Sequence, residues 1–234
     1  MLQTGFIEVD GERITHHYLC HYRPWAYGFD KLSKSLIQFK NKYLIDVEAW
    51  VSCSVEYMSE FENKSPLVLR ALQADELQVS QSTNLPLDLL GRELSRSLGG
   101  WYKPWLLTKE RITRPAKTLT RKEREMELRN VYFFQEDTGL ARSILIIDDI
   151  LTTGFTMAAI IRSIRAKSRG IPIQLFTLAC TDSEAKLNST VDLRGDQFTW
   201  QDKGWNRVRE DPHGYGGDLS ELKRLIHSNF SFQE

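Results

Sequence analysis

The most informative part of the hydrophobic pattern is a short uninterrupted apolar run late in the chain. Residues 144–147 are Ile-Leu-Ile-Ile, which is typical of a strand that is covered on both faces at the centre of a parallel sheet. A 3.6-residue apolar repeat follows and predicts a helix that ends near Gly170, and a second apolar run at 171–178 predicts the next strand. This order predicts a right-handed βαβ unit.

The pattern before this unit alternates between strand and helix signals. Residues 1–13 read as a strand or hairpin edge with a turn at Asp10-Gly11, and the aromatic segment 16–27 leads into a helical region. The same periodicities predict helices at 32–39, 47–58 and 87–98, and strands at 66–72 and 131–134. We therefore predict an α/β fold with a mostly parallel central sheet flanked by helices, formed by residues 1–182. The polar segment 183–234 is expected to be a C-terminal appendage packed on this domain, with a last helix from Asp218.

Composition narrows the possible classes of protein. The 31 basic and 31 acidic residues balance, which argues against coating of nucleic acid or membrane through net charge alone. Three cysteines without a C-x-x-C pair exclude a disulfide framework or a four-cysteine zinc site. The histidines His16, His17 and His21 lack the spacing of a metal site and are expected at a packed or exposed aromatic edge. No signal peptide or transmembrane run is visible, so we expect a soluble, cytoplasmic protein without a membrane partner.

Residues 148–156 place acids, hydroxyls and a glycine at the end of the central strand. Ligands of open α/β sheets bind there, and a short loop that enters a helix exposes backbone N–H groups to a phosphate. The acids suit ribose hydroxyls or a Mg²⁺ ion that links them to a pyrophosphate, while the threonine hydroxyls and the close approach allowed by glycine suit a phosphate. The residues are Asp148, Asp149, Thr152, Thr153, Gly154 and Thr156.

Either half of this segment alone has a simpler explanation. Two acids at a strand end can simply be solvated, and Thr-Thr-Gly can form an ordinary helix-capping turn. Both halves in register within a βαβ unit favour a site for a ribose 5-phosphate, such as 5-phosphoribosyl-1-pyrophosphate (PRPP) or a nucleotide 5′-phosphate.

The run 144–156 resembles the PRPP-binding signature of type I phosphoribosyltransferases: an apolar strand, two acids and T-T-G-x-T. Among these it is similar to the ComF/GntX-like subfamily, to which the segments 36–40, 119–124 with 131–133, and 176–181 add weaker matches. The similarity covers roughly residues 16–182 and is strong only at the signature.

The resemblance implies a type I phosphoribosyltransferase-like fold, with residues 1–60 as its hood. It implies Mg²⁺-dependent transfer of a phosphoribosyl group from PRPP to an unidentified nitrogen acceptor, and a homodimer or a partner encoded nearby. In this carry-over Asp148 and Asp149 contact the ribose hydroxyls, with Mg²⁺ held mainly through PRPP. The 5-phosphate would be held by Thr152, Thr153, Gly154, Phe155 and Thr156, and the pyrophosphate by Arg70 and Ala71 in the loop 69–72.

The chain also departs from the family pattern. The zinc ribbon that often precedes the domain is absent, and residues 83–86, Thr-Asn-Leu-Pro, replace the family's G-F-N-Q. Glu127 stands where the family has an asparagine, and the tail after Asp182 has no counterpart. These departures leave open the acceptor and an alternative function, a catalytically inactive PRPP or nucleotide sensor or a DNA-handling accessory protein.

The segment 109–124 is locally basic, with seven Lys or Arg against two Glu. It can be a solvated helix face, or, at this place in the resembled family, a loop over the pyrophosphate. Basic groups stabilise the charge that develops on a leaving pyrophosphate, and we expect Arg121 and Arg124 to supply this contact. Contact with the backbone of single-stranded DNA is the minor alternative.

Overall fold

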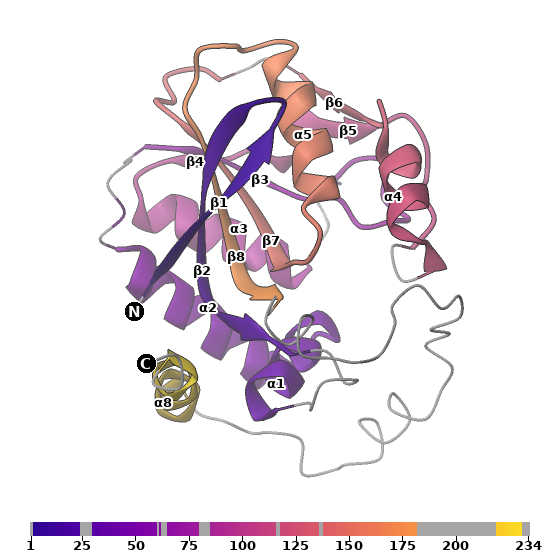
Figure 1. Ribbon diagram of the computed structural model, residues 1–234. Helices are drawn as coiled ribbons and strands as arrows, with labels where there is room; N and C mark the ends of the chain where they lie inside the picture. Colours follow the sequence, from indigo (N-terminus) through magenta and orange to yellow (C-terminus); the bar gives the residue numbers. More distant parts are fainter. Residues whose placement is uncertain are drawn as a thin grey trace.

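A six-stranded sheet forms the centre of the molecule (Figure 1). The computed structural model describes residues 2–23, 30–59, 61, 65–79, 85–115, 118–135, 138–181 and 219–230. Neighbouring strands are parallel except for the first pair, so the predicted mostly parallel α/β sheet is confirmed. In spatial order the strands are β1 (Gln3–Val9), β2 (Glu12–Tyr22), β8 (Ile173–Thr181), β7 (Ile144–Leu151), β3 (Leu67–Arg70) and β4 (Trp101–Tyr102).

The N-terminal hairpin follows the turn predicted from the sequence. Asp10 and Gly11 take positive φ angles of 51° and 83°, which suits a tight turn between two strands. β2 continues to Tyr22 because it pairs with β8 along its length, whereas the sequence analysis expected the chain to leave the strand earlier.

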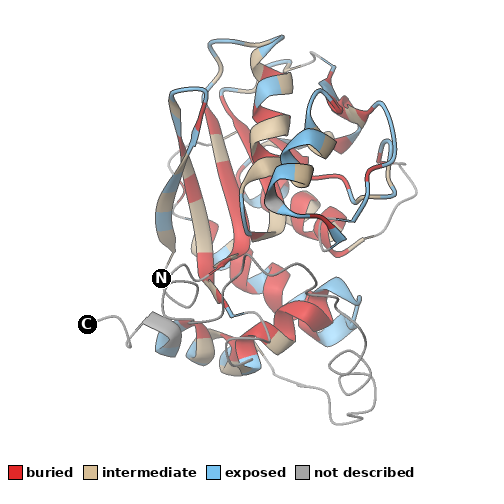
Figure 2. Ribbon diagram, turned by 45° about the vertical axis from the view of Figure 1, so that its right-hand side comes forward, coloured by how far each residue is buried: buried red, intermediate tan, exposed pale blue. Residues whose placement is uncertain are grey.

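The predicted βαβ unit consists of β7, α5 (Phe155–Arg165) and β8. Ile144 and Ile146 face one half of the core, which includes α5, and Leu145 and Ile147 face the other. All four side chains are fully buried, because β7 lies inside the sheet and is covered on both faces (Figure 2). This arrangement confirms the expectation drawn from the apolar run.

Helices cover the second face of the sheet. They are α1 (Lys31–Lys40), α2 (Leu44–Met58), α3 (Pro86–Ser97) and α8 (Leu219–Phe230). Asp30 caps α1 by accepting a hydrogen bond from the Ser33 N–H at 2.7 Å. Leu222 and Ile226 of α8 are buried in the same core cluster. The remainder of the tail, including Asp218 and its predicted cap, lies outside the described residues.

A smaller antiparallel pair sits beside α5: β5 (Leu107–Lys109) with β6 (Tyr132–Phe134). Between these strands the chain passes through a loop and α4 (Arg121–Leu128), which contacts α5. Thr120 and Glu123 begin α4 with a reciprocal capping box. Within the part of the chain that the structure describes, no helix is long and apolar enough to cross a membrane.

Candidate functional site at the ends of β3 and β7

A cavity of about 300 Å³ lies where β3 and β7 end at the same edge of the sheet. This volume is at the lower end of the range for small-ligand sites. The backbone segment 71–74 after β3 forms one wall, and six charged side chains surround the space. They are Lys40, Arg114, Arg124, Glu127, Asp148 and Asp149.

The two acids predicted from the sequence both line this cavity. Each accepts a hydrogen bond from the next backbone N–H: Asp148 from Asp149 at 2.9 Å and Asp149 from Ile150 at 2.7 Å. β7 continues to Leu151, so the acids lie within the strand rather than at its last residues. Burial and the neighbouring charge of Asp149 raise the pKa of Asp148 to about 7. Near neutral pH, Asp148 can therefore either donate or accept a proton.

Lys40 joins the site from a distant part of the chain. It is the last residue of α1, and its Nζ lies 3.1 Å from Oδ2 of Asp149. The buried residues Leu36 and Phe39 fix this end of the helix against the core. The negative charge of Asp149 is the main cause that raises the pKa of Lys40, so the lysine stays protonated and balances one of the two acids.

The predicted phosphate-binding residues at the turn into α5 do not all line the cavity. Gly154 adopts φ 76° and stands at the N-cap position of α5. A glycine has no side chain that could accept a hydrogen bond from the N–H groups of the first turn. Thr156 lines the cavity. Among the described cavity walls, neither Thr152 nor Thr153 contributes, and both side chains are exposed. The structure thus brings one of the three threonines beside the acids.

Arg70 does not occupy the position expected of a pyrophosphate ligand. Its side chain is fully buried. Its Nε donates to Asp88 at 2.6 Å, and its two terminal nitrogens donate to the Glu76 carboxylate at 2.7 Å each. A guanidinium that is paired on both sides and inaccessible is a structural group. In this conformation α3 and the loop after β3 supply carboxylates that enclose the guanidinium, so the predicted contact with a pyrophosphate would require these ion pairs to open.

The same network shapes the wall that Ala71 was expected to provide. Arg70 also donates to the Ala71 carbonyl at 3.0 Å, and Lys109 Nζ donates to the carbonyls of Gln73 and Ala74 at 2.6 and 2.9 Å. These bonds hold the loop 71–76 from behind. Ala71 lines the cavity, and Arg70 contributes to the site in this conformation by positioning that backbone.

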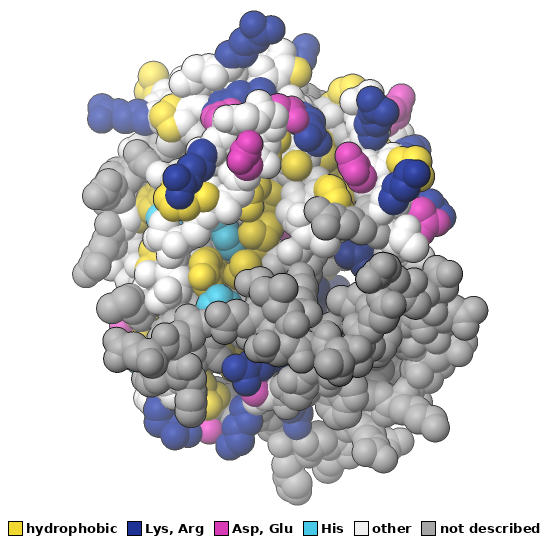
Figure 3. Space-filling view, viewed as in Figure 1, with side chains coloured by type: hydrophobic (Ala, Val, Ile, Leu, Met, Phe, Trp, Pro, Cys, Tyr) yellow, Lys and Arg dark blue, Asp and Glu magenta, His cyan; other side chains and the backbone are white. Residues whose placement is uncertain are grey.

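The basic segment reaches the cavity through Arg114 and Arg124. Arg124 Nε donates to the Leu119 carbonyl at 3.1 Å, and partial burial lowers the pKa of Arg124. Arg121 begins α4, and its side chain lies outside the described part. On the face seen in Figure 3, basic side chains lie apart from one another, with acidic ones between them. Among the described residues visible on that face, the basic side chains form no continuous surface.

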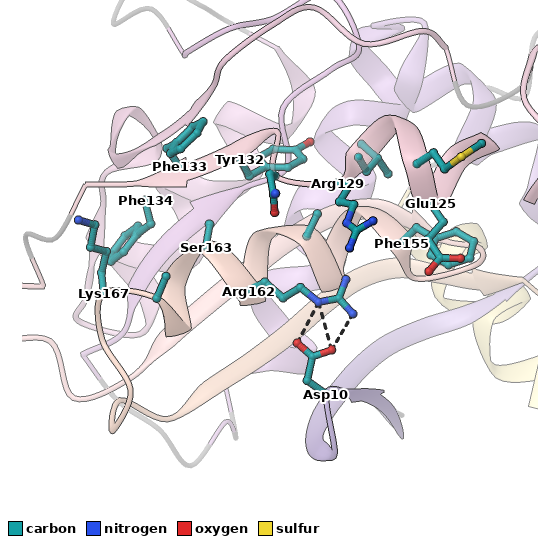
Figure 4. A pocket seen from close by; sticks show the side chains of 15 residues that line it. Asp10, Glu125, Arg129, Tyr132, Phe133, Phe134, Phe155, Arg162, Ser163 and Lys167 are labelled. Atoms are coloured by element: carbon teal, nitrogen blue, oxygen red, sulfur yellow. Dashed lines mark hydrogen bonds and ion pairs between the residues drawn. The ribbon is translucent and has the colours of Figure 1, made fainter. Parts of the chain in front are cut away.

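A second cavity, about 680 Å³, is lined by α4, α5, β6 and the turn at Asp10 (Figure 4). Phe155 lines this cavity and not the one at the acids, so the fourth position of T-T-G-F-T points away from the predicted phosphate site. Arg162 is bound to Asp10 there, with distances of 2.8 to 3.2 Å. We assign the functional site to the smaller cavity because the acid doublet lines it together with three cationic side chains, Lys40, Arg114 and Arg124.

Lys40, Arg114 and Glu127 are site residues that the sequence analysis did not select. Lys40 ends a segment that resembles the family, and Arg114 belongs to the basic run, so a weak signal existed for both. Of the histidines, His16 is buried and bonded to Thr177 at 2.8 Å. Among the described residues, no three His, Cys, Asp or Glu side chains group as a metal site.

Neither a scan against models of protein families nor a search of curated proteins finds a match to this chain.

Proposed function

We propose that this protein binds PRPP at the acid doublet and transfers its phosphoribosyl group to a nitrogen nucleophile, as a type I phosphoribosyltransferase-like enzyme. One observation carries the proposal. The acid doublet lines a cavity together with three cationic side chains and with Thr156 from the first turn of α5, and the N-cap of this helix is a glycine without a capping side chain. A ribose that carries phosphate at one end and pyrophosphate at the other needs acceptors for its hydroxyls and positive charge for both anionic groups.

The carboxylates of Asp148 and Asp149 would accept hydrogen bonds from the two ribose hydroxyls. Lys40 forms an ion pair with Asp149 at 3.1 Å, and the Thr156 hydroxyl with the first turn of α5 would bind the 5-phosphate. Arg114 and Arg124 face the same cavity and would bind the pyrophosphate.

In the reaction the bond from ribose C1 to the pyrophosphate oxygen breaks, and its electron pair leaves with pyrophosphate. A bond from C1 to the acceptor nitrogen forms, and the nitrogen then loses a proton. The arginines stabilise the charge that grows on the leaving group, and the cavity holds the reacting atoms in position.

Two carboxylates and the oxygens of a pyrophosphate fit the ligand preference of Mg²⁺, which usually keeps several waters and takes only one or two protein carboxylates. Asp148 and Asp149 are the residues that would hold it. When bound, the ion adds positive charge beside the pyrophosphate.

The test is calorimetric titration of PRPP with Mg²⁺ into the wild type and into the double variant Asp148→Asn, Asp149→Asn. A matched control removes two exposed carboxylates elsewhere, Glu8→Gln on β1 with Glu48→Gln on α2. We expect saturable binding in the wild type and the control, and loss of binding in the site variant. Equal binding in all three would contradict the site, and no binding in the wild type would contradict the function.

Turnover is tested separately. If PRPP binds, a panel of nitrogen acceptors is screened for release of pyrophosphate. Release that requires Asp148 and Asp149 supports the transferase. Binding without release for any acceptor supports the alternative, a PRPP or nucleotide sensor.

A further inference from the structure

Glu127 is an acid held by several cationic and polar donors on the wall of the candidate cavity. Its carboxylate accepts hydrogen bonds from Arg111 Nη1 at 2.8 Å, Arg114 Nε at 3.2 Å and the Arg114 backbone N–H at 3.0 Å. Arg111 Nη2 also donates to the Glu127 carbonyl at 2.7 Å. The two arginine side chains come from the loop after β5, so the contact ties that loop to α4.

The electrostatics of this contact are those of an anion site that is already filled. The Glu127 side chain is only 10 % exposed, against 47 % and 58 % for Arg111 and Arg114. The donors lower the pKa of Glu127 to about 2, so the carboxylate stays ionised. Two guanidinium groups and a backbone N–H that converge on one point are the donors that bind phosphate oxygens in proteins.

The position links this cluster to the acid doublet. Glu127 and Arg114 line the same 300 Å³ cavity as Asp148 and Asp149. An anionic group that enters beside the acids therefore meets Arg114, whose charge is balanced by Glu127, and Arg111 contacts the same carboxylate from outside the cavity lining.

We propose that Arg111, Arg114 and the Arg114 N–H form a pyrophosphate subsite, and that Glu127 occupies it as an internal competitor while no ligand is bound. The inference rests on the proposed function, because it names the subsite for the leaving group of PRPP. The incoming pyrophosphate displaces Glu127 from the arginines, and the return of Glu127 assists release of the product. The affinity for pyrophosphate is reduced by the fraction of molecules in which Glu127 holds the arginines.

The test uses inorganic pyrophosphate, titrated calorimetrically into the full chain without Mg²⁺. In Glu127→Gln the competitor loses its charge, and we expect binding about tenfold tighter than in the wild type. The control is Glu125→Gln, which removes the same charge from the same helix at an exposed position outside this cavity. Its affinity should stay within about twofold of the wild type.

A second variant tests the pyrophosphate subsite even if Glu127→Gln fails to fold. Arg111→Gln with Arg114→Gln should bind pyrophosphate at least about tenfold more weakly than the wild type. Circular dichroism of each variant verifies the fold.

The outcomes separate this inference from the proposed function. If PRPP binds the wild type but Glu127→Gln binds pyrophosphate no tighter than Glu125→Gln, the internal competitor is refuted and the PRPP site stands. Unchanged affinity in the double arginine variant refutes the subsite. If the wild type binds no PRPP, the proposed function itself fails.

Discussion

Replacing Asp148 by asparagine should stabilise the protein at neutral and alkaline pH. Asparagine has the shape of the protonated acid and keeps the oxygen that accepts the Asp149 N–H at 2.9 Å. The substitution removes a charge that is poorly solvated and lies next to the charge of Asp149. Burial and the charge of Asp149 both raise the pKa of Asp148 because both destabilise its ionised form. Removing the charge of Asp148 should therefore remove both unfavourable contributions.

The magnitude follows from the change in pKa on folding. A shift from 3.8 to about 7 corresponds to a destabilisation of up to about 4 kcal/mol in the ionised form, at about 1.4 kcal/mol for each pKa unit. The folded protein binds the proton more tightly than the unfolded chain, so stability falls as the pH rises between these values. Well below pH 3.8 both states are protonated and the effect disappears. The gain is large beside a total stability of about 5–15 kcal/mol.

Urea unfolding from pH 4 to pH 9 measures this effect. The difference in free energy of unfolding between Asp148→Asn and the wild type should be small at pH 4, below about 1 kcal/mol, grow toward pH 7 and then level off. Asp75→Asn, the same substitution at an exposed loop position, should show no such rise. A variant that is no more stable than the wild type at pH 8, or a gain that persists in full at pH 4, would refute the reasoning.

Three further predictions concern the structure around the site. Arg70→Leu leaves two carboxylates without their buried counter-charge and should cost about 3–5 kcal/mol in urea unfolding; a loss below about 1 kcal/mol would contradict the role assigned to this network. In Gly91→Ala the new methyl group would overlap the ring of Tyr102, so we expect a loss of about 1–3 kcal/mol in thermal unfolding, whereas helix propensity alone predicts a gain. Burial lowers the pKa of His16 to about 4, so its contribution to stability is intact above pH 6.5 and is lost as the pH falls toward 4. His16→Gln should flatten this part of the profile of melting temperature against pH, and an unchanged profile would contradict it.

The βαβ unit could be predicted from the sequence because its signals are local. Four consecutive apolar residues, 144–147, fit only an element that is covered on both sides, and the helical repeat after Gly154 lies within one short stretch. The residue at which the strand ends could not be predicted from local signals. β7 continues past the acids because Ile150 and Leu151 still pair with β8, and that pairing depends on residues far away in the sequence.

The roles of individual cations could not be predicted for a physical reason. An arginine at the end of a buried strand, such as Arg70 in β3, has the same sequence context whether its side chain faces a ligand or a carboxylate. Arg70 became structural because Glu76 and Asp88 close around it, a result of packing between β3 and α3. Lys40 reaches Asp149 only after α1 has docked against the sheet, so no spacing rule links the two.

The candidate site combines choices that local stability disfavours with supports that make them tolerable. Aspartate is disfavoured in strands, yet two stand side by side in β7, where burial opposes their charge. Lys40 and two backbone N–H groups offset part of that cost, and the Arg70 network fixes the opposite wall. Residues that disfavour the local structure but are stabilised by their surroundings are typical of functional sites. The expected stabilisation by Asp148→Asn is the measurable form of this argument, because a charge that costs stability is retained when it binds a ligand.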